Sequence, residues 1–152
     1  EYLVQRGLSL AKYHGAIFDI RVYMQKPKSN WILSGMVARV AAPNRYVTNY
    51  HTGGFAKSLH SVLAYRFRNN PKKVAHSISK ITKLSQIIAN NLSYHHPKVR
   101  ELGIDFAIDQ TGHLWFIEAN SHPGHKLFSQ LPDKTMLHRI KKNKRFIKKW
   151  YR

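Results

Sequence analysis

The chain has 152 residues, enough for a single domain with a substantial hydrophobic core. Its 26 Lys and Arg residues against 7 Asp and Glu give a net charge of +19, which favours nucleotides, nucleic acid, anionic lipid or acidic polymers as partners. The lack of cysteine excludes disulfides and cysteine-ligated zinc, and no apolar run approaches the roughly 18–20 residues of a membrane span. The first residues also lack the basic start and long apolar centre of a signal peptide.

The N-terminal part of the chain predicts strands. A short strand is expected over residues 2–5. Residues 17–25 alternate between apolar and polar side chains, which is the pattern of a half-buried strand. The polar face of that strand carries Asp19, Arg21, Tyr23 and Gln25. Residues 31–42 are mostly apolar, and the turn residues at 27–30 predict an antiparallel hairpin between the two strands.

The middle of the chain predicts a polar loop followed by helices. The loop covers residues 44–54, and a short helix is expected at about 58–65. A long helix is predicted over 72–92, with Asn70 as its N-cap and Pro71 at its first position. Its apolar stripe, expected to pack against a sheet, consists of Val74, Ile78, Ile81, Leu84, Ile87, Ile88 and Leu92.

A second hairpin follows the long helix. Its strands are expected at 102–108 and 113–120, with turn residues at 109–112 between them. An even-length loop centred on this turn would place Asp105 opposite Phe116.

Side chains alternate along each strand, so this pairing puts Asp105, Glu118 and Asn120 on one face. Two carboxylates and an amide oxygen are the hard ligands that Mg²⁺ prefers and usually shares with substrate phosphates. Three of the seven acidic residues lie in this hairpin, the third being Asp109. The alternative is an amphipathic hairpin with an ordinary polar outer face.

The last segment, residues 132–152, predicts a basic amphipathic helix or two short ones. A docked C-terminal helix is favoured over a membrane-surface role. No internal repeat or low-complexity linker divides the chain. The predicted fold is therefore a single α+β domain with an antiparallel sheet flanked by helices.

Further polar groups suit a phosphate bound beside the cation. Arg21 could fork onto anionic oxygens, and Asn49 and the backbone amides of Gly53 and Gly54 are further candidates, although turns use a diglycine equally often. Asp19 shares a strand face with Arg21 and is expected to orient it through an ion pair. Surface or structural roles are expected for the histidines, including His95, His96, His122 and His125.

Six segments, in order, resemble the YheC/YheD endospore coat-associated family of ATP-grasp proteins. They are YLVQRGLSL, FDIRVYMQK, GMVARVA, a short loop ending in Gly-Gly, ELGIDFAID and LWFIEANSHPG. The resemblance covers residues 2–124, and the basic tail adds little to it. It implies the fold of the C-terminal ATP-grasp subdomain, with an Asp on one strand and Glu-x-Asn on the next.

The resemblance also implies roles for individual residues. Asp105, Glu118 and Asn120 would hold Mg²⁺ that bridges the phosphates of ATP. Arg21 would contact phosphate or an acyl-phosphate intermediate, which is the one catalytic role assigned. Other nucleotide contacts would come from Gln5, Leu8, Asn49, Gly53 and Gly54.

ATP-grasp ligases phosphorylate a carboxylate with ATP, and an amine or thiol then attacks the product. The resemblance therefore implies the ATP- and Mg²⁺-binding portion of a protein related to carboxylate–amine ligases. Residues 1–152 would form one domain that lacks the N-terminal nucleotide-cradling subdomain, so the chain alone is expected to be a poor catalyst. That subdomain, or a partner chain, would complete the site.

Two other functions compete with ATP-dependent ligation. The chain could be a structural spore coat component that keeps the fold without turnover and assembles with coat proteins. It could also be a basic module that binds polyanions. Nucleic acid is not favoured as the partner, because the aromatic and basic residues of this chain do not alternate as they do in known nucleic-acid-binding motifs. The expected location is the cytoplasm or spore coat of a spore-forming bacterium.

Overall fold

The structure is a computed structural model that describes residues 7–42 and 54–151. An antiparallel sheet forms its centre, with the strand order β4-β3-β2-β5-β6 and with β1 paired to β2. The strands are β1 (Lys12–Tyr13), β2 (Ala16–Gln25), β3 (Ile32–Val40), β4 (Phe55–Lys57), β5 (Glu101–Ile108) and β6 (Leu114–Asn120). The helices are α1 (Leu59–Arg66), α2 (Pro71–His95), the 3-10 helix η2 (Lys126–Gln130) and α3 (Thr135–Trp150). The α+β fold predicted from the sequence is confirmed.

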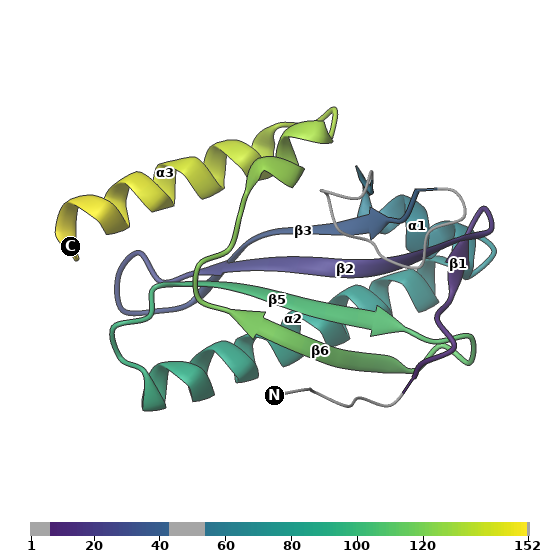
Figure 1. The fold of residues 1–152 in the computed structure, drawn as a ribbon, viewed down its shortest axis with the longest axis horizontal. Helices are drawn as coiled ribbons and strands as arrows, with labels where there is room; N and C mark the ends of the chain where they lie inside the picture. Colours follow the sequence, from purple (N-terminus) through teal and green to yellow (C-terminus); the bar gives the residue numbers. More distant parts are fainter. Residues whose placement is uncertain (1–6, 43–53, 152) are drawn as a thin grey trace.

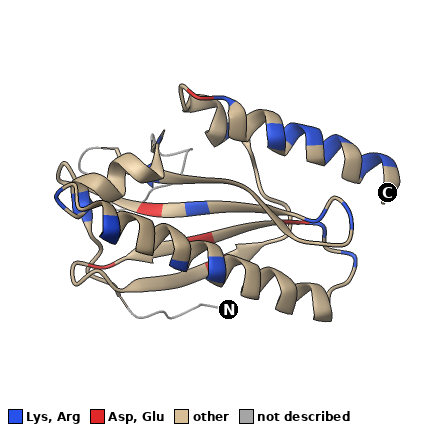
Figure 2. Ribbon diagram, turned by 180° about the vertical axis from the view of Figure 1, so that it is seen from behind, with Lys and Arg blue, Asp and Glu red and all other residues tan. Residues whose placement is uncertain are grey.

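Helices α1 and α2 cover one face of the sheet. In Figure 1, α2 runs behind β5 and β6, and Figure 2 shows it in front of the sheet from the opposite side. The apolar side of β2 packs against these helices, as the alternation predicts. Asn70 caps α2 by accepting a hydrogen bond from the Lys73 amide at 3.1 Å, and Pro71 occupies the first turn.

The predicted apolar stripe of α2 needs one correction. Ile87 is 62% exposed, so it lies off the packed face. The buried positions include three small residues instead, namely Ser85, Ala89 and Ser93. Small side chains let the helix backbone approach the sheet closely. A pattern of large apolar residues does not mark such positions as buried, because serine and alanine are only weakly hydrophobic.

The opposite face of the sheet has two halves. In the α3 half, η2 and α3 pack over Tyr23 and Val37, and their buried contacts include Phe128 and Ile140. The charged half lies farther along the same strands and carries Asp19, Arg21, Arg39, Asp105 and Glu118. The basic tail forms one helix, α3, rather than two.

The α3 half is held by side-chain hydrogen bonds as well as apolar contacts. Gln25 is fully buried, and its side-chain amide donates to Glu101 Oε1 at 3.1 Å and to the Ile140 carbonyl at 3.2 Å. Asn143 on α3 donates to Gln25 Oε1 at 3.3 Å and to Ser34 Oγ at 3.2 Å. These bonds fix α3 on the sheet. No helix among the described residues is long and apolar enough to cross a membrane.

Candidate functional site

One row of side chains crosses the charged half of the sheet. Arg21 on β2 pairs with Asp105 on β5, and Asp105 pairs with Glu118 on β6. The next pair on the same face is Gly103 with Asn120. Directly opposed residues share a face, so β5 and β6 bring Asp105, Glu118 and Asn120 to one side of the sheet.

The predicted register of this hairpin is wrong. Asp105 lies opposite Glu118, and Phe116 lies opposite Phe106. Two irregularities explain the difference. The loop has an odd length, because Asp109 donates its amide to the His113 carbonyl at 3.0 Å, and the register then shifts between Asp105 and Phe106. The two shifts of one residue add up to a shift of two residues. Because side chains alternate with a period of two, Asp105 and Glu118 still lie on the predicted face.

Asp105 is the most enclosed acid of the row, with its side chain 5% exposed. Arg21 donates from Nε to Asp105 Oδ1 and from Nη2 to Oδ2, the second bond measuring 2.8 Å. Arg39 on β3 donates from Nη2 to the same Oδ2 at 2.7 Å. Both oxygens of Asp105 therefore accept from arginine.

Asp19 forms its ion pair with Arg39, with hydrogen bonds of 2.6 and 2.7 Å. Asp19 was expected to orient Arg21, but Asp105 is the carboxylate that accepts two hydrogen bonds from Arg21. Arg39 was not singled out at all. A lone arginine within an otherwise apolar strand was the available signal, but its partners depend on the register of three strands.

These ion pairs shift the protonation of the cluster. Burial alone would raise the pKa of Asp105, but the hydrogen bonds and charges of Arg21 and Arg39 outweigh it and hold that pKa below its usual value. Burial alone would lower the pKa of Arg39, yet Asp19 and Asp105 raise it. Both shifts favour the charged forms, so Asp105 is an anion and Arg39 a cation at neutral pH.

Space for the Arg21 guanidinium depends on Gly103. A Cβ added at Gly103 would lie 2.8 Å from Pro123 Cβ and 3.2 Å from Arg21 Nη1. The Pro123 carbonyl lies 3.2 Å from the Tyr23 hydroxyl, which also donates toward Glu101 Oε1 at 3.0 Å. Burial and the neighbouring Glu101 raise the pKa of Tyr23, so this hydroxyl keeps its proton. The segment after β6 is thereby held against the sheet beside Arg21.

The carboxylate and amide oxygens of this row are the kind of ligands that bind a hard divalent cation. Glu118 is exposed and Asn120 lies two residues beyond it on β6. Asn120 Oδ1 already accepts from the His122 amide at 2.8 Å, so its oxygen would coordinate through its second lone pair. Within residues 7–42 and 54–151, no three His, Asp or Glu side chains gather into a metal-binding group. A cation here would rest on two carboxylates and one amide, and would need further oxygen ligands from its substrate.

The other predicted site residues lie elsewhere or beyond the described residues. Leu8 is half-buried next to the β5–β6 turn, where the Ser9 carbonyl accepts from the Gln110 amide at 2.9 Å. Gly54 is buried just before β4, whose first residue Phe55 pairs with Val40. The predicted strand over 2–5, with Gln5, Asn49 and Gly53, lies outside the residues that the structure describes.

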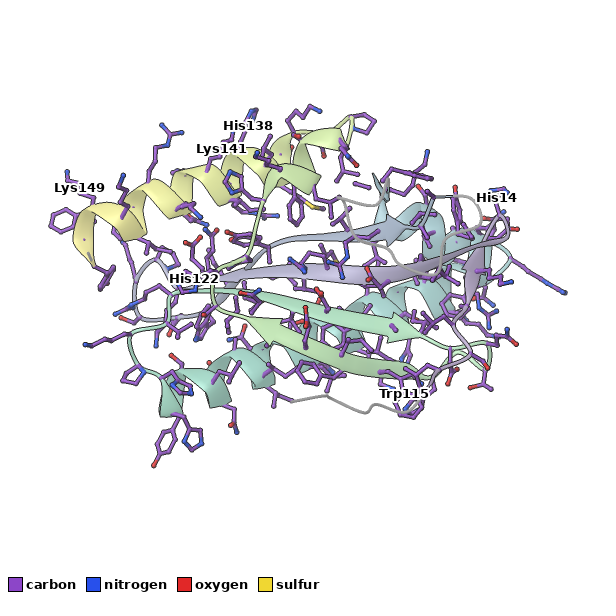
Figure 3. All side chains as sticks on the ribbon, in the orientation of Figure 1. His14, Trp115, His122, His138, Lys141 and Lys149 are labelled. Atoms are coloured by element: carbon purple, nitrogen blue, oxygen red, sulfur yellow. The ribbon has the colours of Figure 1, made fainter. Side chains whose placement is uncertain are left out.

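The third acid of the hairpin, Asp109, serves the turn. Its Oδ1 accepts from the Thr111 amide, the Thr111 hydroxyl and the His113 amide, and its Oδ2 accepts from Trp115 Nε1 at 2.8 Å. These bonds lower its pKa and keep it ionised. Figure 3 labels Trp115 near the start of β6 and His122 two residues beyond the end of that strand.

Comparison with known proteins gives a family and two relatives. A family model described as YheC/D like ATP-grasp matches residues 1–146. Endospore coat-associated protein YheD of Bacillus subtilis (strain 168) is 30% identical over 132 residues, which cover 85% of this chain and 28% of YheD. Endospore coat-associated protein YheC of the same strain is 26% identical over 128 residues, covering 83% of this chain and 34% of YheC. The chain thus spans about a third of the length of either relative.

Proposed function

This chain belongs to the YheC/D-like ATP-grasp family, and from that membership we propose that it binds ATP together with Mg²⁺ on the charged half of its sheet. The observation that carries the proposal is the placement of Asp105, Glu118 and Asn120 on one face of two paired strands, beside Arg21. Asp105 and Glu118 would hold the cation with Asn120, and Arg21 would bind a phosphate oxygen. When bound, Mg²⁺ neutralises charge on the phosphates of the nucleotide.

Arg21 and Arg39 make cation binding depend on nucleotide. They already satisfy both oxygens of Asp105, so a bare cation would compete with two guanidinium groups for that carboxylate. A phosphate arriving with the cation offers the arginines another anion to bind. The charged half therefore favours the joint binding of nucleotide and Mg²⁺ over binding of either alone.

The reaction proposed for the whole protein is carboxylate–amine ligation. A substrate carboxylate would attack the terminal phosphate of ATP to give an acyl phosphate and ADP, and an amine would then displace inorganic phosphate. Arg21 would neutralise charge on the transferred phosphate, because a guanidinium aimed at that position needs little reorganisation during the reaction. Because this chain spans about a third of its relatives, we expect turnover to need a nucleotide-cradling subdomain opposite this sheet face.

Titration of a fluorescent ATP analogue into the 152-residue chain, with and without Mg²⁺, tests the proposal. Glu118→Gln is the informative variant, because Glu118 is exposed and its loss leaves the arginine pairs intact. We expect binding that needs Mg²⁺ and falls on the order of tenfold or more in Glu118→Gln, since a metal ligand is lost. Asp133→Asn is the matched control, because Asp133 is an exposed acid next to α3 that keeps an oxygen for the Thr135 amide. Equal affinity in both variants would contradict the proposal.

A second candidate is a structural component of the spore coat that keeps the fold without using the metal site. Both relatives are named endospore coat-associated proteins. The specific observation in its favour is that both oxygens of Asp105 already accept from arginine and that Asn120 Oδ1 already accepts one hydrogen bond. This candidate predicts no Mg²⁺-dependent nucleotide binding and a place in the coat of a spore-forming bacterium, so the same titration separates it from the first.

A further inference from the structure

A groove separates the turn after β2 from the second half of α3. Its volume is about 940 Å³. One wall is formed by residues 27–30 and the other by α3, with Ile32 at the start of β3 between them. None of the lining residues belongs to the charged half of the sheet, so the groove is a separate feature of the molecule.

The rim of this groove is cationic. Lys28 stands on the turn, while Lys142, Arg145 and Lys149 stand on α3, and no acidic residue lines the groove. Figure 2 shows blue bands along α3 and no red on it, and Figure 3 labels Lys149 near the C-terminal end of the helix. The helix sequence contains seven Lys and Arg residues and no Asp or Glu. The occupant that complements this rim is an anion.

The floor of the groove is apolar. Ile32 lies there and is 37% exposed, and Pro27 and Phe146 add apolar surface from the two walls. An occupant must therefore bring apolar groups to the floor and negative charge to the rim. We propose that this groove binds an acidic peptide segment of a partner protein, in which carboxylate side chains meet the four cations and an apolar side chain fills the floor.

The walls of the groove are held in place before any partner binds. Arg100 donates from Nη1 to the Lys28 carbonyl at 2.9 Å, which fixes the turn. Arg139 donates to the Ser34 carbonyl at 2.9 Å, and Asn143 bonds to Gln25 and Ser34, which fixes α3. A preformed groove loses little conformational entropy on binding.

Two other anionic partners fit less well. Single-stranded nucleic acid binds through bases stacked on aromatic rings. Among the described residues, Phe146 is the one aromatic residue that lines this groove, so the groove offers no series of rings on which successive bases could stack. A membrane would require an apolar helix face, but Leu137, Ile140 and Ile147 of α3 are buried within the fold.

Fluorescence anisotropy with synthetic probes tests the proposal on the 152-residue chain. The probe is a fluorescein-labelled peptide that repeats Glu-Glu-Leu, compared with peptides that repeat Gln-Gln-Leu and Glu-Glu-Ser. We expect the Glu-Glu-Leu peptide to bind most tightly of the three. The variant Lys142→Gln/Arg145→Gln/Lys149→Gln should weaken its binding on the order of tenfold, from the loss of three ion pairs.

A matched variant separates the groove from the general positive charge of the chain. Lys73→Gln/Lys80→Gln/Lys83→Gln removes the same charge from exposed positions on α2, and it should change the affinity by less than about twofold. Ile32→Ser should weaken the Glu-Glu-Leu peptide and leave the Glu-Glu-Ser peptide unchanged. Equal losses in the two triple variants, or tighter binding of oligo-dT or of phosphatidylserine vesicles than of the peptide, would overturn the proposal.

Discussion

The two halves of one sheet face use the same strands in different ways. In the α3 half, Tyr23 and Gln25 of β2 are fully buried and satisfied by neutral hydrogen bonds or by Glu101. In the charged half, Asp19 and Arg21 of the same strand take part in ion pairs that cross to β3 and β5. Alternation alone gives all four residues the same face, so the difference comes from what covers them.

The coverage decides what each half can do. Helices α3 and η2 remove water from the α3 half, where an unpaired charge would be costly and neutral groups serve as structural contacts. The charged half carries two arginines and two aspartates in close pairs, with the exposed Glu118 next to them. Charges that are paired with one another can be re-paired with a ligand, whereas the packed contacts of the α3 half cannot change partners without opening the fold.

The largest expected effect comes from removing Asp105. Asp105→Ala leaves Arg21 and Arg39 without their shared buried carboxylate, and it should lower the free energy of unfolding by about 3–5 kcal/mol. Urea unfolding followed by circular dichroism measures the change. Glu118→Ala, in the same row but exposed, should stay within about 0.5 kcal/mol of the parent chain. If Asp105→Ala lowered the free energy of unfolding by less than about 1 kcal/mol, the ion pairs of Asp105 would be no stronger than ordinary surface ion pairs. Asp105 and Glu118 would then not differ in their contribution to stability.

A smaller effect is expected in the α3 half, from steric rather than electrostatic causes. Gly35 lies under Phe128, and a Cβ added there would lie 2.7 Å from the ring at Cε1. The ring is fully buried and cannot move aside easily, so Gly35→Ala should cost about 1–3 kcal/mol in the same urea experiment. Gly124→Ala is the control, because a Cβ at Gly124 meets nothing within 4 Å. Equal stability of the two variants would show that the α3 half is packed more loosely than the structure indicates.

Features encoded by local periodicity were predictable from the sequence. The alternation over 17–25 gave β2, and the cap and stripe around Asn70 gave α2, within a few residues of their ends. The shared face of Asp105, Glu118 and Asn120 was also predicted correctly, because two one-residue shifts restore it, whereas Phe116 lies opposite Phe106 and not opposite Asp105. Ile87 was assigned wrongly to the packed face, since spacing cannot show that Ser85 and Ala89 take the buried positions.

Features encoded by pairing between distant strands were not predictable. The ion pairs of Arg39 with Asp19 and Asp105 depend on the register of β3 on β2 and of β2 on β5, which no local sequence pattern contains. The odd loop at Asp109 and the shift after Asp105 are equally invisible, because each depends on hydrogen bonds made only in the folded hairpin. The candidate ligands and Arg21 could therefore be named from the sequence, but Arg39 and the pairing of both arginines with Asp105 could not.

The smallest expected effect is the acid sensitivity of the charged half. The pKa of Asp105 is lower in the folded chain than the ordinary value of about 3.9 for an unfolded aspartate. Its ion pairs therefore stabilise the fold fully above that value, and the stabilisation is lost as the pH falls toward the folded pKa. Asp109 and Asp133 also have lowered pKa values, so the whole chain should lose stability below about pH 4.

Asp105→Asn isolates the share of that acid loss due to Asp105. The amide cannot ionise, so the variant should be less stable than the parent chain at neutral pH and approach it in acid, where the parent carboxyl is protonated as well. Urea midpoints measured from pH 7 down to pH 3 would show the two curves converging. Parallel curves would mean that protonating Asp105 costs the fold nothing. The ion pairs with Arg21 and Arg39 would then be no stronger than the hydrogen bonds that an amide can make. Moving the arginines from Asp105 to a bound phosphate would in that case not change how firmly Asp105 is held.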